Sequence, residues 1–282
     1  MPKTTHYYTH SGKAPIISVF FMIICGLSAA FVLSAIYGYA IAFIPFIYLN
    51  FFITLGFGVL TGVAIGAGGK LGKARNPGIY AWVGLVIGLF AEYAGWVAWV
   101  YASFDQTSLI IHPGELLVGL QEIAETGAWS IFGWTPTGFA IYCIWTIEGL
   151  MIVCASALIA FVYVESTPFC EHCSLWVENV RTRSNLQTIE NEDEFKTKLE
   201  EGQYESLLGL KKADDSSKIS TEIELNGCKT CENSNYLSLS TITVSVDDKG
   251  KESKDSSKFV CNFRLTNEQH KKVSEFVENQ SQ

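Results

Sequence analysis

Two Cys-x-x-Cys pairs are the residues of this chain whose type and spacing point most directly to chemistry. Cys170 and Cys173 form the first pair, and Cys228 and Cys231 form the second. Thiolates are strong ligands for zinc, and two pairs can place four sulfur atoms around one ion as a tetrahedron. Such a site joins distant parts of a chain and stabilises a small domain whose hydrophobic core is thin. The four cysteines therefore predict a structural Zn²⁺ site.

The pattern around the pairs resembles a zinc ribbon that carries a helical insertion. Residues that alternate as in strands flank both pairs, over 176–189, 219–225, 236–246 and 258–265. The two pairs are 54 residues apart, whereas compact sites of this kind use about 15–20. We assign the excess to an insertion with a helix over about 191–212, and a capping box at Thr266 predicts a last helix. The glycine often found just after each pair is replaced by Ser174 and Glu232.

The cysteines also allow other interpretations. A rubredoxin-like iron site uses the same four ligands and would make the chain a membrane redox protein. The first pair superficially resembles a thioredoxin-type redox pair, although no βαβ pattern surrounds it, and the four thiols could also be unliganded. We expect His172 to be exposed beside the first pair rather than to be a ligand. We expect Cys261 to lie in a strand and to be a core residue rather than a fifth ligand.

Before the cysteines, the chain is apolar enough to cross a membrane. Residues 1–164 carry 5 Lys+Arg and 6 Asp+Glu, whereas residues 165–282 carry 15 and 22. A span needs about 20 apolar residues, and the pattern predicts four spans, over about 15–37, 41–67, 78–102 and 138–164. We place the turn between the first two near Tyr37-Gly38-Tyr39. The predicted fold is a membrane α-helical domain, residues 1–164, and a small α+β zinc-ribbon-like domain, residues 165–282.

The distribution of positive charge predicts the orientation. Lys3 and Lys13 precede the first span, while Lys70, Lys73 and Arg75 follow the second. By the positive-inside rule both termini are cytoplasmic, in a cell or inner membrane, unless one apolar segment is re-entrant or lies at the interface. Cytosolic thiols stay reduced, which favours metal over a disulfide.

Pro113 predicts a helix in the outer loop, with Leu116, Leu117, Leu120, Ile123 and Ala124 on one face. We interpret this helix as a cap over the bundle.

Three strongly polar side chains interrupt the apolar spans: Asn50, Glu92 and Glu148. Each is roughly ten residues from the outer end of its predicted helix, or about 15 Å, so we expect one shared layer near the midplane. Two neighbouring carboxyls there would share a proton or bind a cation. The alternative is that they only fasten the bundle. Small residues at helical intervals predict close packing, within one chain or between copies in a homo-oligomer: Gly26, Ala30, Ser34, Gly38, Gly62, Gly66, Gly84, Gly88, Ala91 and Gly95.

Composition and motifs exclude several functions. The acidic C-terminal domain lacks the clustered Lys and Arg that bind nucleic acid. There is no Ser/His/Asp arrangement at a recognisable motif and no nucleotide fingerprint, so we do not expect an enzyme. We expect an integral membrane protein whose cytoplasmic zinc-binding domain meets a protein partner as an interaction or sensing module. The alternatives are a proton or cation channel or transporter that uses Asn50, Glu92 and Glu148, and an iron redox protein.

Overall fold

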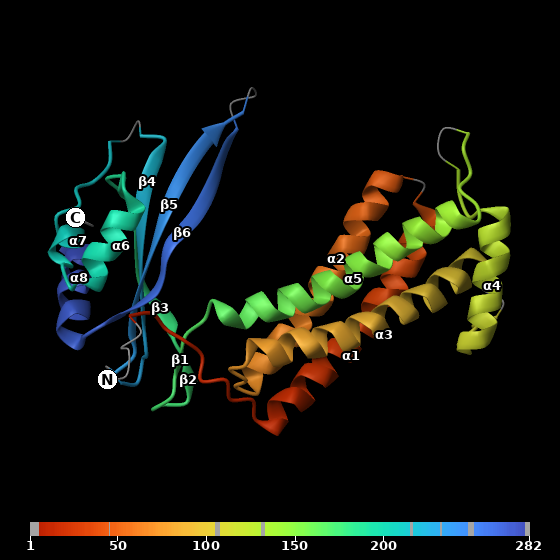
Figure 1. The fold of residues 1–282 in the computed structure, drawn as a ribbon, viewed down its shortest axis with the longest axis horizontal. Helices are drawn as coiled ribbons and strands as arrows, with labels where there is room; N and C mark the ends of the chain where they lie inside the picture. The colour runs from red at the N-terminus through yellow and green to blue at the C-terminus, as the bar shows by residue number, and fades with distance from the viewer. Residues whose placement is uncertain are drawn as a thin grey trace. The chain divides into compact units, whose positions relative to one another are not determined.

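The chain folds into two compact units. The computed structural model describes residues 6–44, 46–104, 108–130, 133–214, 217–231, 233–247 and 251–279. One unit comprises Ser11–Glu165, and the other comprises the described residues of Met1–His10 and Ser166–Gln282. The helical unit is drawn mainly in red to green and the sheet unit mainly in green to blue (Figure 1). The N-terminal segment thus belongs with the C-terminal sheet unit, whereas the sequence division at residue 164 had placed it with the helices.

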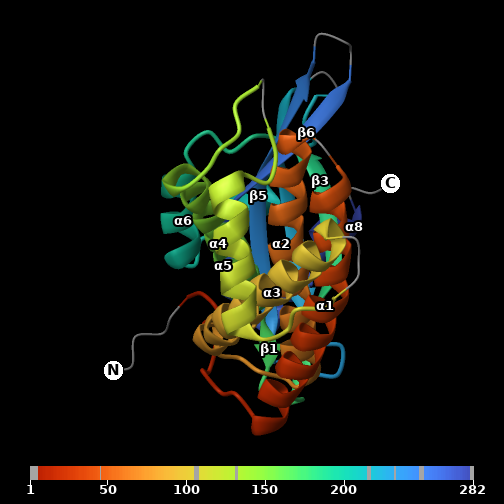
Figure 2. The ribbon, with the colours of Figure 1, turned by 90° about the vertical axis from the view of Figure 1, so that its right-hand side faces the viewer.

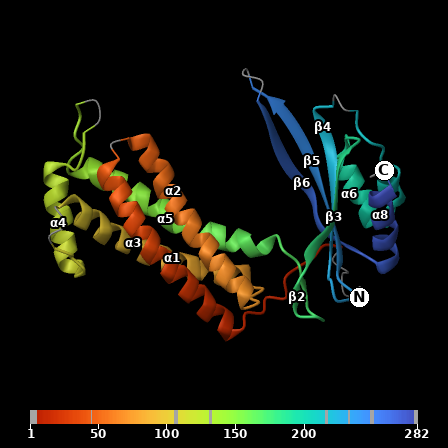
Figure 3. The same cartoon turned by 180° about the vertical axis from the view of Figure 1, so that it is seen from behind.

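Four helices of the first unit are long and apolar enough to cross a membrane. They are α1 (Ile16–Phe43), α2 (Ile47–Leu71), α3 (Pro77–Ser103) and α5 (Phe139–Glu165). Helix α1 packs against α2 and α3, and α5 packs against the same two helices, so the four form a bundle (Figure 3). Large apolar side chains point away from it, among them Phe31 with 71% and Trp82 with 70% of their surface exposed. Lipid is the solvent that suits such a surface.

The turn between the first two helices was predicted in the wrong place. Helix α1 continues through Tyr37-Gly38-Tyr39 to Phe43, and α2 begins at Ile47. Ile44 has extended backbone angles, φ −98° and ψ 108°. The residue after it in the sequence is proline, which disfavours helical angles in the residue before it. Gly38 serves packing instead, because a Cβ atom there would lie 2.5 Å from the Ala98 carbonyl carbon.

Small residues do allow close helix contacts, as their spacing predicts. In α1 the buried residues include Gly26, Ala30, Ser34 and Gly38. In α3 a Cβ atom on Gly84 would lie 2.6 Å from the Ala157 Cα atom of α5. In α2 a Cβ atom on Gly62 would lie 2.7 Å from the Ser156 carbonyl oxygen of α5. The bundle therefore depends on residues without side chains at its crossing points.

Helix α4 (Pro113–Thr126) begins at the predicted proline. The His112 side chain caps it by accepting a 3.3 Å hydrogen bond from the Gly114 N–H. Its buried residues pack in one cluster with side chains of α3 and α5: Leu116, Ile123, Ala124, Trp99, Val100, Ile141 and Trp145. Helix α4 therefore covers one end of the bundle, which faces the viewer in Figure 2. Leu117 is an exception, because it is exposed rather than part of the packed face.

The second unit is built on an antiparallel four-stranded sheet of order β3-β4-β5-β6. Its strands are β3 (Glu178–Leu186), β4 (Ile219–Gly227), β5 (Asn235–Val246) and β6 (Glu252–Leu265), and a separate hairpin pairs β1 (Phe169–Cys170) with β2 (Leu175–Trp176). Helices α6 (Glu192–Glu200), α7 (Glu205–Leu208) and α8 (Asn267–Asn279) supply Phe195, Leu199, Leu207, Val273 and Val277 to the core on the sheet. Residues 248–250, between β5 and β6, lie outside the described part of the chain.

Local signals at the helix starts are confirmed. The Asn191 side chain accepts a 3.1 Å hydrogen bond from the Glu194 N–H at the beginning of α6. At the beginning of α8 the Thr266 N–H donates to Gln269 Oε1 at 2.9 Å, and the Gln269 N–H donates to Thr266 Oγ1 at 3.2 Å. This reciprocal pair is a capping box.

The N-terminal segment forms an antiparallel bridge with the outer edge of β6. The Arg264 N–H donates to the His6 carbonyl at 2.8 Å, and the Tyr8 N–H donates to the Asn262 carbonyl at 2.9 Å. Tyr7 forms the bridge between them, opposite Phe263. Residues more than 250 positions apart in sequence are therefore neighbours in one sheet.

Candidate functional site

The four predicted cysteine ligands come together at one point of the sheet unit. Cys170 ends β1 and Cys173 lies in the turn before β2, while Cys228 and Cys231 lie in the turn between β4 and β5. All four Sγ atoms lie within 4.8 Å of one another, and those of Cys170 and Cys231 are 3.5 Å apart. We call this group the four-cysteine cluster. Two hairpin turns that are distant in sequence therefore face each other through their thiols.

The geometry of the cluster fits one metal ion. Four sulfur atoms that surround an ion at about 2.3 Å are about 3.8 Å apart, which lies within the observed range. All four cysteines are free thiols rather than disulfides. Four thiolates in a tetrahedron suit zinc and also iron, so the donor set identifies a metal site without identifying its metal. With four ligands in place, no coordination position is left for a catalytic water.

The first turn is formed without the glycine that often follows such a pair. The Cys173 N–H points to the Cys170 Sγ at 3.5 Å, and the chain then reverses at Ser174. Ser174 has φ of 53°, in the left-handed region that costs a residue with a Cβ atom about 1–2 kcal/mol. Its counterpart after the second pair, Glu232, lies outside the described residues.

The thiols affect one another's pKa values. Burial raises the pKa of Cys170, but hydrogen bonds with Ser234, the Cys173 backbone and the other thiols outweigh burial and lower it to about 6. Hydrogen bonding with Cys231, followed by burial, raises the pKa of the Cys173 thiol to about 12. Without metal, the hydrogen bonds of the cluster therefore favour the thiolate of Cys170 over that of Cys173. A bound divalent cation would instead hold all four as thiolates.

Aromatic residues pack around the cluster. Cys170, Val177 and Tyr236 are buried together, and Tyr8 packs on them from the N-terminal segment. The rings of Tyr8 and Tyr236 meet edge to face with centroids 5.4 Å apart. The sequence offered no signal for this contribution of the N-terminal segment, because the pairing joins the two ends of the chain.

Two expectations about neighbouring residues have different outcomes. His172 is exposed and does not belong to the cluster, as predicted. Cys261 lies in β6 as predicted, but its side chain is exposed, so the expectation that it is a core residue is wrong. Register irregularities between β5 and β6 and the left-handed φ of 53° at Asn262 interrupt the alternation of inward and outward residues there.

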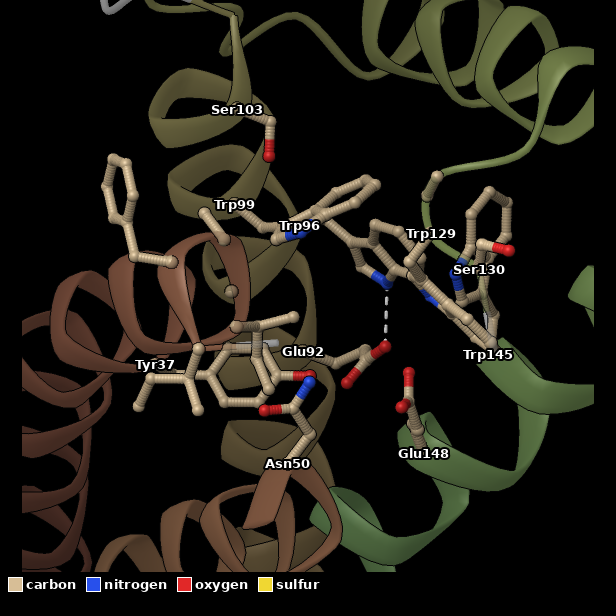
Figure 4. Close-up of a pocket in the computed structure, with 16 residues that line it drawn as sticks. Tyr37, Asn50, Glu92, Trp96, Trp99, Ser103, Trp129, Ser130, Trp145 and Glu148 are labelled. Atoms are coloured by element: carbon tan, nitrogen blue, oxygen red, sulfur yellow. Dashed lines mark hydrogen bonds between the residues drawn. The ribbon is translucent and has the colours of Figure 1, made fainter. Parts of the chain in front are cut away.

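The helical unit contains a cavity of about 270 Å³ near the end that carries α4 (Figure 4). Its walls include the three polar residues singled out from the sequence, Asn50 of α2, Glu92 of α3 and Glu148 of α5. Aromatic side chains form much of the rest: Tyr37, Phe43, Trp96, Trp99, Trp129 and Trp145. We call it the aromatic cavity.

One of the three polar residues, Asn50, lies less deep in its helix than predicted. Asn50 lies in the first turn of α2, where its N–H donates to the Phe46 carbonyl at 3.0 Å, because α2 begins later than expected. Glu92 and Glu148 lie well inside α3 and α5. The expectation that Asn50 is about ten residues inside its helix is therefore wrong, although all three residues line the same cavity.

The polar groups of the cavity are only partly satisfied within the protein. Trp96 Nε1 donates a 2.6 Å hydrogen bond to Glu92 Oε1. The Asn50 Oδ1 atom is buried and has no hydrogen-bond partner among the described residues. The described lining contains no Lys, Arg or His. Two carboxyl groups therefore face a largely aromatic space without a cationic side chain to pair with them.

A second, mostly apolar hollow shares three of its lining residues with the aromatic cavity. It is lined by Glu92, Trp96 and Trp145 together with Leu117, Leu120, Gln121, Leu150 and Val153. Gly149 makes room for the Glu92 carboxyl, because a Cβ atom there would lie 3.0 Å from Glu92 Oε1. Glu92, Trp96 and Trp145 thus line both spaces.

The aromatic lining was not recognised from the sequence, although a signal exists. Trp96 follows Glu92 by one helical turn, and Trp145 precedes Glu148 by one turn, so each carboxyl has an indole on its own helix face. The three indoles of Trp96, Trp99 and Trp145 meet edge to face, with centroids 4.8–6.3 Å apart. That cluster requires helices α3 and α5 to be neighbours, which residue spacing alone does not establish.

Comparison of the chain with protein-family models, with curated proteins and with solved structures found no match in any of the three. The function therefore has to be inferred from the two sites themselves.

Proposed function

We propose that the chain is an integral membrane protein whose C-terminal unit is a cytosolic, zinc-bound module for protein interaction or sensing. The observation that carries the proposal is the meeting of four thiols, within 4.8 Å of one another, from two separate hairpin turns. A closed set of four thiolates is typical of structural zinc, which stabilises a fold and performs no reaction. The role of the module would then lie on its surface.

The pairing of the N-terminal segment supports a topology with an even number of crossings. Residues 6–10 belong to the same unit as the residues after 165, and Tyr7 pairs with Phe263 within that unit. This pairing favours a topology in which both ends of the helical unit lead to the same side of a bilayer. Lys13 before the first helix, and Lys73 and Arg75 after the second, favour the cytosol for that side.

The edge of β6 is the surface that we propose for a protein partner. The segment Glu252–Lys258 is exposed at every residue, and in the described part of the chain its outer edge has no strand partner. The chain's own residues 6–8 occupy only the far end of the same edge. A free edge can accept an added strand from a partner. Charged side chains on the edge, such as Lys254 and Asp255, disfavour pairing with strands that do not match them.

Two measurements on the full-length protein test this proposal. We expect one equivalent of zinc per chain, and we expect a cytosolic protein to cross-link to residues 252–258. Reversing two charges, Lys254→Glu with Asp255→Lys, keeps the net charge of the edge and should abolish the cross-link. A colourless preparation with zinc excludes the iron alternative, whereas iron in the sample would favour the redox protein. Cross-links unchanged by the charge exchange would reject the edge as the docking surface.

The aromatic cavity favours a second candidate, a proton or cation channel or transporter. Two carboxyls and one amide from three different helices face one space, as such a pathway requires. We expect Glu92→Gln and Glu148→Gln to abolish cation flux into proteoliposomes. The same substitution at Glu122, which is exposed on α4, is the control and should leave flux unchanged. Equal flux in all three variants would reject this candidate.

A further inference from the structure

We infer that the aromatic cavity binds a small organic cation whose charge is carried by an ammonium group. The inference rests on the second candidate function, because it assigns a ligand class to the same cavity. It adds that the ligand is organic, that the aromatic rings recognise its charge, and that the protein binds it whether or not it is carried across the membrane.

The charged groups of the cavity lining favour a cationic ligand. Glu92 and Glu148 come from different helices and face the same space (Figure 4). The described lining contains no cationic side chain, so no neighbouring side chain there supplies a positive charge to them. An ionised carboxyl group is stable in an apolar environment only when a positive charge accompanies it. A cationic ligand would supply that charge.

The aromatic walls of the cavity favour an ammonium group over a metal ion. The indoles of Trp96 and Trp145 are perpendicular, at 81°, with centroids 4.8 Å apart, and Trp99 meets Trp96 at 84°. The hydrogen bond from Trp96 Nε1 to Glu92 fixes one indole by its polar edge. Aromatic faces attract ammonium groups, and cages of such rings recognise quaternary ammonium ligands. A metal ion would need oxygen ligands around most of its surface, which these carbon walls do not provide.

The same cavity contains a hydrogen-bond acceptor, the side-chain oxygen of Asn50, that has no donor in the described part of the chain. The buried Oδ1 atom of Asn50 has no hydrogen-bond partner among the described residues. Figure 4 shows the Asn50 side chain in the same part of the cavity as Glu92. A buried acceptor without a partner costs about 1–3 kcal/mol. A ligand with an N–H or O–H group beside its charge would satisfy this atom.

The size of the space restricts the ligand. The cavity has a volume of about 270 Å³, just below the range of about 300–1,000 Å³ typical of pockets for drug-sized ligands. A molecule of the size of choline fits these limits, whereas a complete phospholipid does not. The ligand class is therefore a small ammonium compound with a hydrogen-bonding group.

The test is calorimetric binding to the full-length protein in detergent. The probes are choline, tetramethylammonium and the neutral analogue of choline in which carbon replaces nitrogen. We expect saturable binding of both cations, and at least about tenfold weaker binding of the neutral analogue, since shape is unchanged and only the charge is lost. This comparison needs no variant. No saturable binding of either cation up to about 10 mM, or equal binding of the neutral analogue, would overturn the inference.

Variants locate the site. Glu148→Gln and Trp99→Leu should each weaken choline binding about tenfold, and Glu122→Gln, outside the cavity, should not. Unchanged zinc content and melting temperature show that a variant is folded. Choline binding unaffected by both cavity substitutions in folded protein would contradict the assignment. Binding without any cation flux would reject the channel or transporter and keep the ligand site, so the two failures are distinguishable.

Discussion

The four-cysteine cluster takes all its ligands from two short turns, whereas the aromatic cavity takes its polar groups from three long helices. The cluster has four identical donors that satisfy one ion and leave no ligand position open. The cavity has two carboxyls and one amide oxygen that the protein leaves without cationic partners. The first site therefore suits a permanent structural ion, while the second suits a ligand that can leave.

The largest expected effect follows from removing the metal. Zinc contributes about 10–16 kcal/mol to folding in small zinc domains, as much as the whole stability of a typical domain. Cys228→Ser, or a strong chelator, should therefore unfold the sheet unit, measured by proteolysis between residues 166 and 279. Cys261→Ser, at an exposed thiol outside the cluster, should not.

Choline binding of the Cys228→Ser variant shows whether the two sites are independent. Choline binding to the aromatic cavity should survive Cys228→Ser, because every described lining residue belongs to the helical unit. Resistance of the variant to the protease would contradict a structural metal. Loss of choline binding in that variant would show that the two sites are not independent.

The next effect concerns the helix contacts that frame the cavity. Gly84→Ala places a Cβ atom 2.6 Å from the Ala157 Cα atom and should lower the stability of the bundle by about 1–3 kcal/mol, read as a lower melting temperature in detergent. Gly56→Ala is the matched control, because no atom lies within 4 Å of its Cβ position. Its effect should be neutral or stabilising. Equal melting temperatures of the two variants would argue against the close α3–α5 contact.

A smaller effect is expected at Gly149, which leaves room for the Glu92 carboxyl. Gly149→Ala would place a Cβ atom 3.0 Å from Glu92 Oε1. The carboxyl must then shift, and choline binding should weaken about threefold, or about 0.7 kcal/mol, with no change in charge. Gly119→Ala, in open space on α4, is the control. An unchanged affinity in the Gly149 variant would mean that the position of Glu92 does not matter for the ligand.

The smallest effect is a gain of stability at the first cysteine turn. Ser174 has a left-handed φ of 53°, which glycine adopts without strain. Ser174→Gly should stabilise the sheet unit by about 0.5–1 kcal/mol, measured as slower loss of metal to a chelator. Ser256→Gly, in an extended strand, should give no gain. Faster metal loss from the Ser174 variant would show that the serine side chain itself stabilises the turn.

Much of the architecture could be predicted because its signals are local. Four runs of about 20 apolar residues predicted the long helices, Pro113 predicted the beginning of α4, and Thr266 with Gln269 predicted the capping box of α8. The spacing of the four cysteines predicted their meeting, since each pair lies on one tight turn. The turn after α1 lies later than predicted, because the proline after Ile44 is a stronger signal for a helix end than Gly38.

Features that depend on distant contacts could not be predicted. The pairing of Tyr7 with Phe263 joins the two ends of the chain, and nothing in either segment encodes the register. The exposure of Cys261 follows from an irregular β5–β6 ladder, which strand alternation does not reveal. The aromatic walls needed the arrangement of α3 and α5. By contrast, Asn50, Glu92 and Glu148 could be singled out from the sequence. A polar side chain in an apolar membrane helix is costly however the helices are arranged.

X-ray absorption at the zinc edge of the full-length protein, purified without added metal, shows whether the four-cysteine cluster holds a structural zinc ion. The account predicts one zinc ion per chain with four sulfur neighbours at about 2.3 Å, supplied by Cys170, Cys173, Cys228 and Cys231. Absence of metal, iron in place of zinc, or a shell with nitrogen or oxygen neighbours would contradict it.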